Sequence, residues 1–195
     1  MTKVKKLALI IGVIFMANLA GCKGFFKYAK YESKFPELGI TVDYPQGWIY
    51  KDSRDPKGKF GQVLFIEDKK GDFLKGSFWI LATTDPKIEA KPATVDSLAS
   101  ERIAKRLNYK DSRLVSDSPI VIDGGKGRDI VFSYKTFEKI QSFGAGLLLA
   151  KERTVIFKRK DRFFIISYEN AEKNFRQFDP AFSHMLKSIK FTEVK

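Results

Sequence analysis

Hydrophobic and polar residues alternate over several short segments of this chain, which is the pattern of half-buried β-strands. The first such segment is marked by Ile40, Val42 and Tyr44. Further strands are expected over residues 60–67, 77–83, 120–123, 129–135, 147–158 and 163–168. Two turns, Asp123-Gly124-Gly125 and Lys160-Asp161, are short enough to join neighbouring strands as hairpins, so the sheet is predicted to be antiparallel.

Two other segments repeat apolar residues at helical spacing. The first covers residues 95–107, and Thr94 is a suitable N-cap for it. The second covers residues 175–189 and is rich in phenylalanine. Residues 163–166 are apolar at every position, so that strand needs cover on both faces. The predicted fold class is therefore α+β: an antiparallel sheet with helices packed against both faces, an α/β/α sandwich.

The first 22 residues have the order of an export signal. Three lysines precede an apolar run over residues 7–17, and the run is followed by Leu19-Ala20-Gly21-Cys22. These four residues resemble a bacterial lipobox, which implies a diacylglycerol on the Cys22 sulfur and cleavage after Gly21. The alternatives are a transmembrane anchor and a core helix. The run is short for the first, because a spanning helix needs about 20 apolar residues, and its flanks fit the second poorly.

The residue after the cysteine bears on location. By analogy with lipoproteins of bacteria that have two membranes, an aspartate here retains the protein at the inner membrane. Lys23 stands in that place and permits delivery to the outer membrane. A cell with one membrane would keep the protein on its outer surface. We therefore expect a lipid anchor in the cell membrane or the outer membrane, with the protein facing the periplasm or the exterior.

The composition supports a folded domain, since 44% of the residues are hydrophobic and 18 are phenylalanine. Cleavage after residue 21 leaves 174 residues, which we divide into a tether (22–37) and a single domain (38–195). Cys22 is the only cysteine, so the domain has no internal disulfide. Three of the +13 charges are lysines of the signal, which holds no acidic residue, so the mature chain carries +10.

This positive charge needs a partner that an exported protein can meet. Export argues against nucleic acid and favours lipid head groups and envelope polymers. A general solubilising surface charge is the alternative. Within the tether, four lysines are interleaved with aromatic residues and are candidate contacts to a membrane surface: Lys23, Lys27, Lys30 and Lys34. The alternative is that Tyr31 and Phe35 pack onto the domain as its first ordered residues.

A family resemblance follows from these segments. Residues 40–48 (Ile-Thr-Val-Asp-Tyr-Pro-Gln-Gly-Trp) resemble the start of PsbP-like proteins, a hydrophobic strand followed by Tyr-Pro-x-Gly-Trp. Residues 163–168, 175–182 and 185–191 are similar to the last strand and helix of that family, and the likeness covers residues 38–192. The family includes the extrinsic PsbP subunit of photosystem II, a Ran-binding nuclear-import factor and many bacterial lipoproteins.

The resemblance implies an α/β/α sandwich that docks to other proteins and has no catalytic role. Fold likeness does not transfer a partner. No partner-binding or metal-binding residue of the family matches a position of this chain, so none is carried over.

The chain offers little catalytic chemistry. His184 is the only histidine and lies off the apolar stripe of the last helix, so we expect it to face solvent. Without a second histidine or a free cysteine, zinc sites rich in nitrogen or sulfur and histidine-based triads are excluded. Residues 124–127 fit a glycine hairpin better than a phosphate loop, and residues 68–72 fit a turn better than a calcium loop. We predict no enzyme, no cofactor and no metal site.

Two surfaces remain as candidates for binding. One is the loop over residues 136–146, whose apolar residues anchor a partner or are buried under the end of the sheet. The other is a basic face, which can also be a solvated surface: Lys151, Arg153, Lys158, Arg159, Lys160 and Arg162. The leading hypothesis is a non-catalytic, membrane-anchored lipoprotein that acts as a docking or adaptor module for a cell-envelope protein complex. The alternative is a lipoprotein that binds an anionic small-molecule or polymeric ligand.

Overall fold

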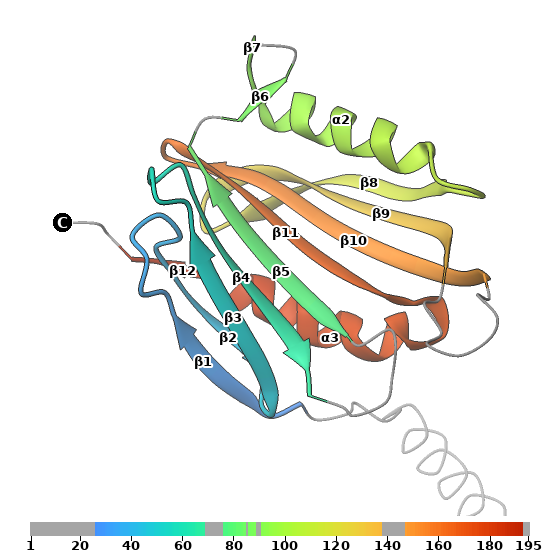
Figure 1. Cartoon of the computed structure of the whole chain (residues 1–195), viewed down its shortest axis with the longest axis horizontal. Coiled ribbons are helices and arrows are strands. Elements are labelled where there is room, and N and C mark those ends of the chain that lie inside the picture. The colour runs from blue at the N-terminus through green and yellow to red at the C-terminus, as the bar shows by residue number, and fades with distance from the viewer. Residues whose placement is uncertain (1–25, 69–75, 85, 89–90, 138–146, 193–195) are drawn as a thin grey trace, which may run out of the picture.

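The computed structural model describes residues 26–68, 76–84, 86–88, 91–137 and 147–192. They form an α+β structure with antiparallel sheets and two helices (Figure 1). The helices are α2 (Val95–Leu107) and α3 (Glu172–Ser188). The strands are β1 (Tyr28–Glu32), β2 (Ile40–Pro45), β3 (Trp48–Arg54), β4 (Phe60–Glu67), β5 (Ser77–Thr83), β6 (Lys87–Ile88), β7 (Lys91–Pro92), β8 (Arg113–Ile122), β9 (Gly125–Phe137), β10 (Leu147–Arg159), β11 (Arg162–Ala171) and β12 (Lys190–Phe191).

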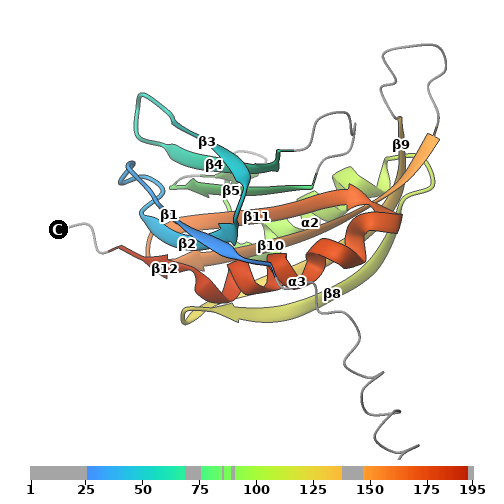
Figure 2. The same ribbon diagram turned by 90° about the horizontal axis from the view of Figure 1, so that it is seen from below.

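The main sheet has seven strands in the order β3-β4-β5-β11-β10-β9-β8, and each neighbouring pair is antiparallel. A second sheet has the order β1-β2-β12 and lies on the same side of the main sheet as α3 (Figure 2). The pair β6-β7 forms a third, small sheet. The predicted hairpins are confirmed. Asp123 and Gly124 have positive φ angles, as a tight β8–β9 turn requires, and Lys160 has a φ of 53° between β10 and β11.

Helix α2 has the predicted bounds and begins with a capping box, in which Thr94 and Ser97 satisfy each other's backbone N–H groups. Its buried residues Leu98 and Ala99 pack in one core cluster with Ile156 of β10. The next residue along that strand, Phe157, belongs to the other core cluster, which contains α3. Alternate side chains of β10 therefore belong to different core clusters, because successive strand residues point to opposite faces.

Helix α3 contributes three buried phenylalanines, Phe175, Phe178 and Phe182, to the aromatic core. Phe178 packs against Trp48, and Phe182 packs against Phe78 and Tyr168. The three-stranded sheet adds Tyr31, and the centre of its ring lies 5.5 Å from the centre of the Phe65 ring of β4. Among the described residues, both core clusters are built from the two helices, the main sheet and the three-stranded sheet.

The start of the folded unit corrects the predicted tether over residues 22–37. Residues 28–32 are the strand β1, which pairs with β2 over its full length. Tyr31 is only 2% exposed, and its hydroxyl donates a hydrogen bond to Asp52 of β3. Tyr31 therefore packs onto the domain, which was the alternative to a role in the tether. The tether prediction failed because Lys30 within β1, and Lys27 and Lys34 beside it, gave this segment the composition of a linker.

Candidate functional site

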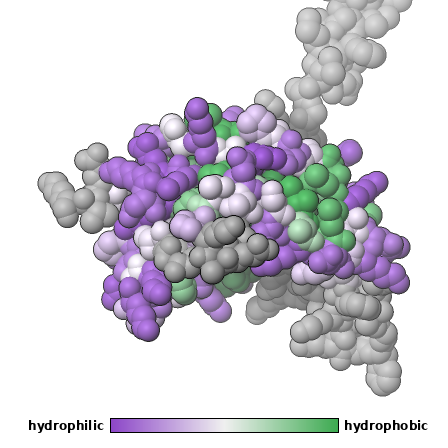
Figure 3. Space-filling view, turned by 90° about the horizontal axis from the view of Figure 1, so that it is seen from above, coloured by the Kyte–Doolittle hydropathy of each residue, from purple (hydrophilic) through white to green (hydrophobic). Residues whose placement is uncertain are grey.

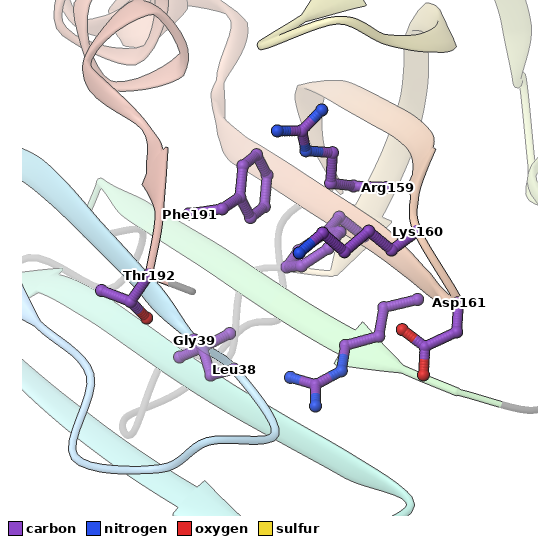
Figure 4. Close-up of a pocket in the computed structure, with 9 residues that line it drawn as sticks. Leu38, Gly39, Arg159, Lys160, Asp161, Phe191 and Thr192 are labelled. Carbon is purple, nitrogen blue, oxygen red and sulfur yellow. The ribbon is translucent and has the colours of Figure 1, made fainter. Parts of the chain in front are cut away.

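A pocket opens at the β10–β11 hairpin, beside β12 and the segment that leads into β2 (Figure 4). Its volume is about 320 Å³. We call it the basic pocket, and its lining is Leu38, Gly39, Arg159, Lys160, Asp161, Arg162, Phe164, Phe191 and Thr192. Three of these residues are cationic and one is acidic, so the pocket carries a net positive charge.

The hairpin concentrates that charge. Because the turn holds only Lys160 and Asp161, its flanking residues Arg159 and Arg162 lie opposite each other in the register. Lys160 is exposed and adopts a left-handed backbone conformation that residues other than glycine rarely adopt. Its side chain extends from the turn toward Phe191 (Figure 4). The short turn thus presents three cations on one small surface.

Arg162 is held by the backbone of the segment before β2. Its Nη1 donates to the carbonyl oxygens of Pro36 and Glu37, the latter at 2.8 Å. Gly39 has a φ of 54°, and a Cβ there would lie 3.1 Å from the Pro36 oxygen. This turn and the hairpin therefore fix each other, and the guanidinium has a defined position at the pocket.

Arg159 is held from the other side. Its Nη2 lies 3.2 Å from Asp123 Oδ2 in the β8–β9 turn, and its guanidinium lies 5.5 Å from the centre of the Phe191 ring. The Arg159 Nε is buried and has no hydrogen-bond partner among the described residues. The floor below is apolar, since Leu38 and Phe164 are nearly inaccessible and Phe164 packs edge-on against Phe191. An acidic group in this pocket would meet unused donors above an aromatic surface.

The structure brings together only three of the six residues of the predicted basic face, namely Arg159, Lys160 and Arg162. Lys158 lies over the Phe163 ring, which belongs to the core cluster of α2. The other two residues are nearer the opposite end of β10 and have acidic neighbours. Lys151 is 3.8 Å from Glu172, and Arg153 binds Asp129, Asp179 and Ser183. Strand alternation and the length of β10 separate residues that are close in sequence.

The predicted anchor residues Leu19, Ala20, Gly21, Cys22 and Lys23 lie outside the described residues. The remaining candidate contacts to a membrane, Lys27, Lys30 and Lys34, are all exposed on or beside β1. Residue 28 pairs with Pro45, and β1 runs from there toward the turn at Gly39. The basic pocket is therefore near the end of β1 at Glu32, whereas Tyr28 begins the strand at the other end.

The sequence predicted that His184 faces solvent, but its side chain contacts two other residues. Its ring stacks on Tyr28 of β1 with centres 3.8 Å apart, and Nε2 lies 3.2 Å from Asp43 Oδ2. Its side chain is 43% exposed. Partial burial and the Asp43 charge raise the pKa of Tyr28. The position two residues after Phe182 could not reveal this contact, because β1 was interpreted as a tether.

A buried ionic cluster under α2 was also missed. Glu152 of β10 is 1% exposed and contacts both Arg102 and Arg106 of the helix. Thr154 donates a hydrogen bond to the same carboxylate at 2.6 Å. Burial alone would lower the pKa of Arg106, but the Glu152 charge raises it. The cluster has the partners of a structural ion pair. The only signal in the sequence was an acidic residue at an inward position of a predicted strand.

Exposed apolar side chains gather at the other end of the main sheet. Leu107 ends α2, Leu114 and Val115 begin β8, and Leu149 lies near the start of β10. They are 37–47% exposed. Figure 3 shows a hydrophobic surface at this end. We call these four residues the apolar end. The predicted binding loop departs from here, but its residues 138–146 lie outside the described residues.

Two features are absent from the described part of the chain. No group of three or more histidine, cysteine, aspartate or glutamate side chains is placed to hold a metal ion. No helix among these residues has the length and hydrophobicity needed to cross a membrane.

The structure is similar to several solved proteins, although no family model and no curated protein matches the sequence. PsbP (CyanoP) from Synechocystis sp. PCC 6803 aligns with a TM-score of 0.55 at 14% identity, covering 89% of this chain and 99% of that one. LpqN of Mycobacterium tuberculosis, described as involved in cell envelope biogenesis, gives 0.52 at 11% identity, with coverages of 87% and 92%.

A third similar structure is the Ran-binding protein Mog1p of Saccharomyces cerevisiae, with a TM-score of 0.51 at 11% identity and coverages of 86% and 97%. Identities this low inform about the fold alone. The three similar structures agree with the resemblance seen in the sequence at both ends of the domain. The chain has a PsbP-like fold.

Proposed function

We propose that this protein is a non-catalytic lipoprotein of the cell envelope, held by a diacylglycerol on Cys22, that docks to an envelope protein complex. The observation that carries the docking role is the apolar end, where Leu107, Leu114, Val115 and Leu149 are exposed together. Their positions lie at one end of the main sheet, and exposed apolar side chains gathered at one end of a domain favour a protein contact. The fold adds support, because the similar structures include a Ran-binding protein and a protein of envelope biogenesis.

The α/β/α sandwich implied by the resemblance is part of this proposal. Helix α2 packs with the cluster around Ile130 and Ile156, and α3 packs with the cluster around Val155 and Phe157. Because these clusters alternate along β10, we infer that each helix covers a different face of the main sheet. The end of the sheet, where the apolar residues lie, is then the surface that the helices leave open.

Cross-linking mass spectrometry on intact cells tests the docking role. We expect the wild-type protein to give a reproducible protein neighbour and Val115→Asp to lose it. A matched control is Ile49→Asp on β3, because Ile49 and Val115 are 45% and 46% exposed on opposite edge strands of the main sheet. A protein neighbour that survives Val115→Asp, or that Ile49→Asp removes equally, contradicts docking through the apolar end. The absence of any protein neighbour contradicts the adaptor role itself.

The lipid anchor has its own test. Mass spectrometry of the mature N-terminus should find a diacylglycerol on residue 22, and Cys22→Ser should remove it and release the protein from the membrane fraction. An unmodified wild-type protein in the soluble fraction would overturn this part of the proposal.

A second candidate function is the binding of an anionic envelope ligand. The observation that favours it is the basic pocket, with Arg159, Lys160 and Arg162 above an aromatic floor. Its volume of about 320 Å³ lies in the range of small-molecule sites. Lipid or glycan adducts in the cross-linking experiment, in place of a protein neighbour, would favour this candidate over docking.

A further inference from the structure

A second hollow adjoins the basic pocket on the far side of Phe191. It lies between β8 and the C-terminal part of α3, has a volume of about 710 Å³, and we call it the β8–α3 groove. Phe191 lines both hollows. Asp123 of the groove and Arg159 of the pocket form the ion pair described above. The two hollows therefore meet at one ridge, made by an aromatic ring and an ion pair.

The groove combines apolar residues of β8 and α3 with polar lining residues, among them Asp123, Arg153 and Ser183, and it has cations at its rim. Its lining includes Ile122, Leu186 and Ile189, which are buried, while Val121 is 66% exposed at its edge. Lys187 and Lys190 also line it and are exposed. Neither lysine forms an ion pair with a described residue, and the same holds for Lys160 in the pocket. The joined surface thus offers free cations along an apolar floor.

Such a surface is complementary to a molecule that has an acidic head and an apolar chain. The head would sit beside Arg159 and Lys160, which both line the basic pocket. The chain would cross Phe191 and lie along the groove, where it covers the exposed Val121 and the half-buried Ile120. Charge complementarity selects the head, and apolar burial supplies the affinity.

We propose that the basic pocket and the β8–α3 groove form one binding site for an amphiphilic anion, a phosphate or carboxylate head on an alkyl or acyl chain. A free fatty acid and a phospholipid both present this chemistry. The inference rests on the ligand-binding candidate function and refines it by naming the apolar part of the ligand. It is independent of docking through the apolar end, which lies at the other end of the sheet.

Isothermal titration calorimetry on residues 22–195 with Cys22→Ser tests the site, because both core clusters lie within this part of the chain. The probes are octyl phosphate below its micelle concentration, inorganic phosphate and neutral octyl glucoside. We expect octyl phosphate to bind at least about tenfold more tightly than either of the others, since burial of two methylene groups already gives such a gain.

Variants assign the two halves of the site. Arg159→Gln together with Lys160→Gln should weaken octyl phosphate at least tenfold and abolish binding of inorganic phosphate. Val121→Ser should weaken octyl phosphate and leave inorganic phosphate unchanged, because it removes apolar surface from the groove without adding a charge. Two controls, Lys110→Gln and Val115→Asp, change an exposed cation and an exposed β8 residue elsewhere. Circular dichroism should show that every variant unfolds at the wild-type temperature within a few degrees.

Octyl phosphate that binds no better than inorganic phosphate overturns the amphiphile and leaves a simple anion site. The absence of binding by both phosphates overturns this inference and the ligand-binding candidate together. Equal losses in the control variants overturn the assignment to these residues. Binding of an acidic, apolar peptide in place of octyl phosphate overturns it in favour of a protein partner along the β8 edge. Phosphatidic acid and palmitate then distinguish the two lipid sources.

Discussion

Neutralising Glu152 is the most direct test of how α2 is held on the sheet. Glu152→Gln keeps the volume of the side chain but removes its charge, leaving Arg102 and Arg106 without their shared carboxylate. Loss of one partner of a buried ion pair costs about 3–5 kcal/mol. The arginine side chains here are 28% and 15% exposed and reach water in part, so we expect the lower end, about 3 kcal/mol.

This loss converts to a measurable change. In a domain of this size, about 1 kcal/mol shifts the unfolding midpoint by roughly 2–4 °C, so Tm should fall by about 6–12 °C. Thermal and urea unfolding followed by circular dichroism measure it. A double-mutant cycle with Arg106→Met should give a coupling energy above about 1 kcal/mol.

The matched control is Glu101→Gln. Glu101 pairs with Lys105 on the exposed side of the same helix, and such i,i+4 pairs contribute only about 0.5 kcal/mol or less. If Glu152→Gln lowers stability no more than this control, or if its coupling to Arg106 is absent, the ionic attachment of α2 is refuted.

Three further predictions concern packing, pH and the membrane. Gly127→Ala should lower stability by about 1–3 kcal/mol, because a Cβ would lie 2.4 Å from the Ile156 oxygen; an unchanged Tm contradicts this contact. Burial is the main cause that raises the pKa of Tyr31, Tyr134 and Tyr168. Unfolded tyrosines ionise near pH 10, so the contribution of these tyrosines to stability should be constant below that pH, and stability should fall above it by about 1.4 kcal/mol per pH unit for each tyrosine. Urea midpoints at pH 9 and 11 measure this, and equal midpoints refute it. The soluble form (residues 22–195 with Cys22→Ser) should bind anionic vesicles weakly and lose binding at 0.15 M salt, where the Debye length is about 8 Å. Replacing Lys27, Lys30 and Lys34 by glutamine should weaken it further, and equal binding to neutral vesicles rules the electrostatic contact out.

Most of the helices and strands could be predicted from the sequence. The helix over 95–107 and the strands over 60–67 and 77–83 have the predicted bounds, since each has a clear period and a clear boundary signal. Strand β8 begins at Arg113, seven residues before its prediction, because most of its side chains are exposed and show no alternation. Strand β1 was missed for a related reason, since its exposed positions hold the charged residues Lys30 and Glu32.

The candidate site, too, could be predicted from the sequence only in part. The short Lys160-Asp161 turn and the excess of positive charge can be read from the sequence, and they already predict a cationic hairpin. Only the tertiary structure shows that Phe191 and the turn at Gly39 close that hairpin into a pocket, because these segments are far apart in the chain. The same holds for Tyr28 on His184 and for Arg102 and Arg106 on Glu152. Periodicity records which side of an element is buried, whereas the identity of the neighbour depends on how elements distant in sequence pack together.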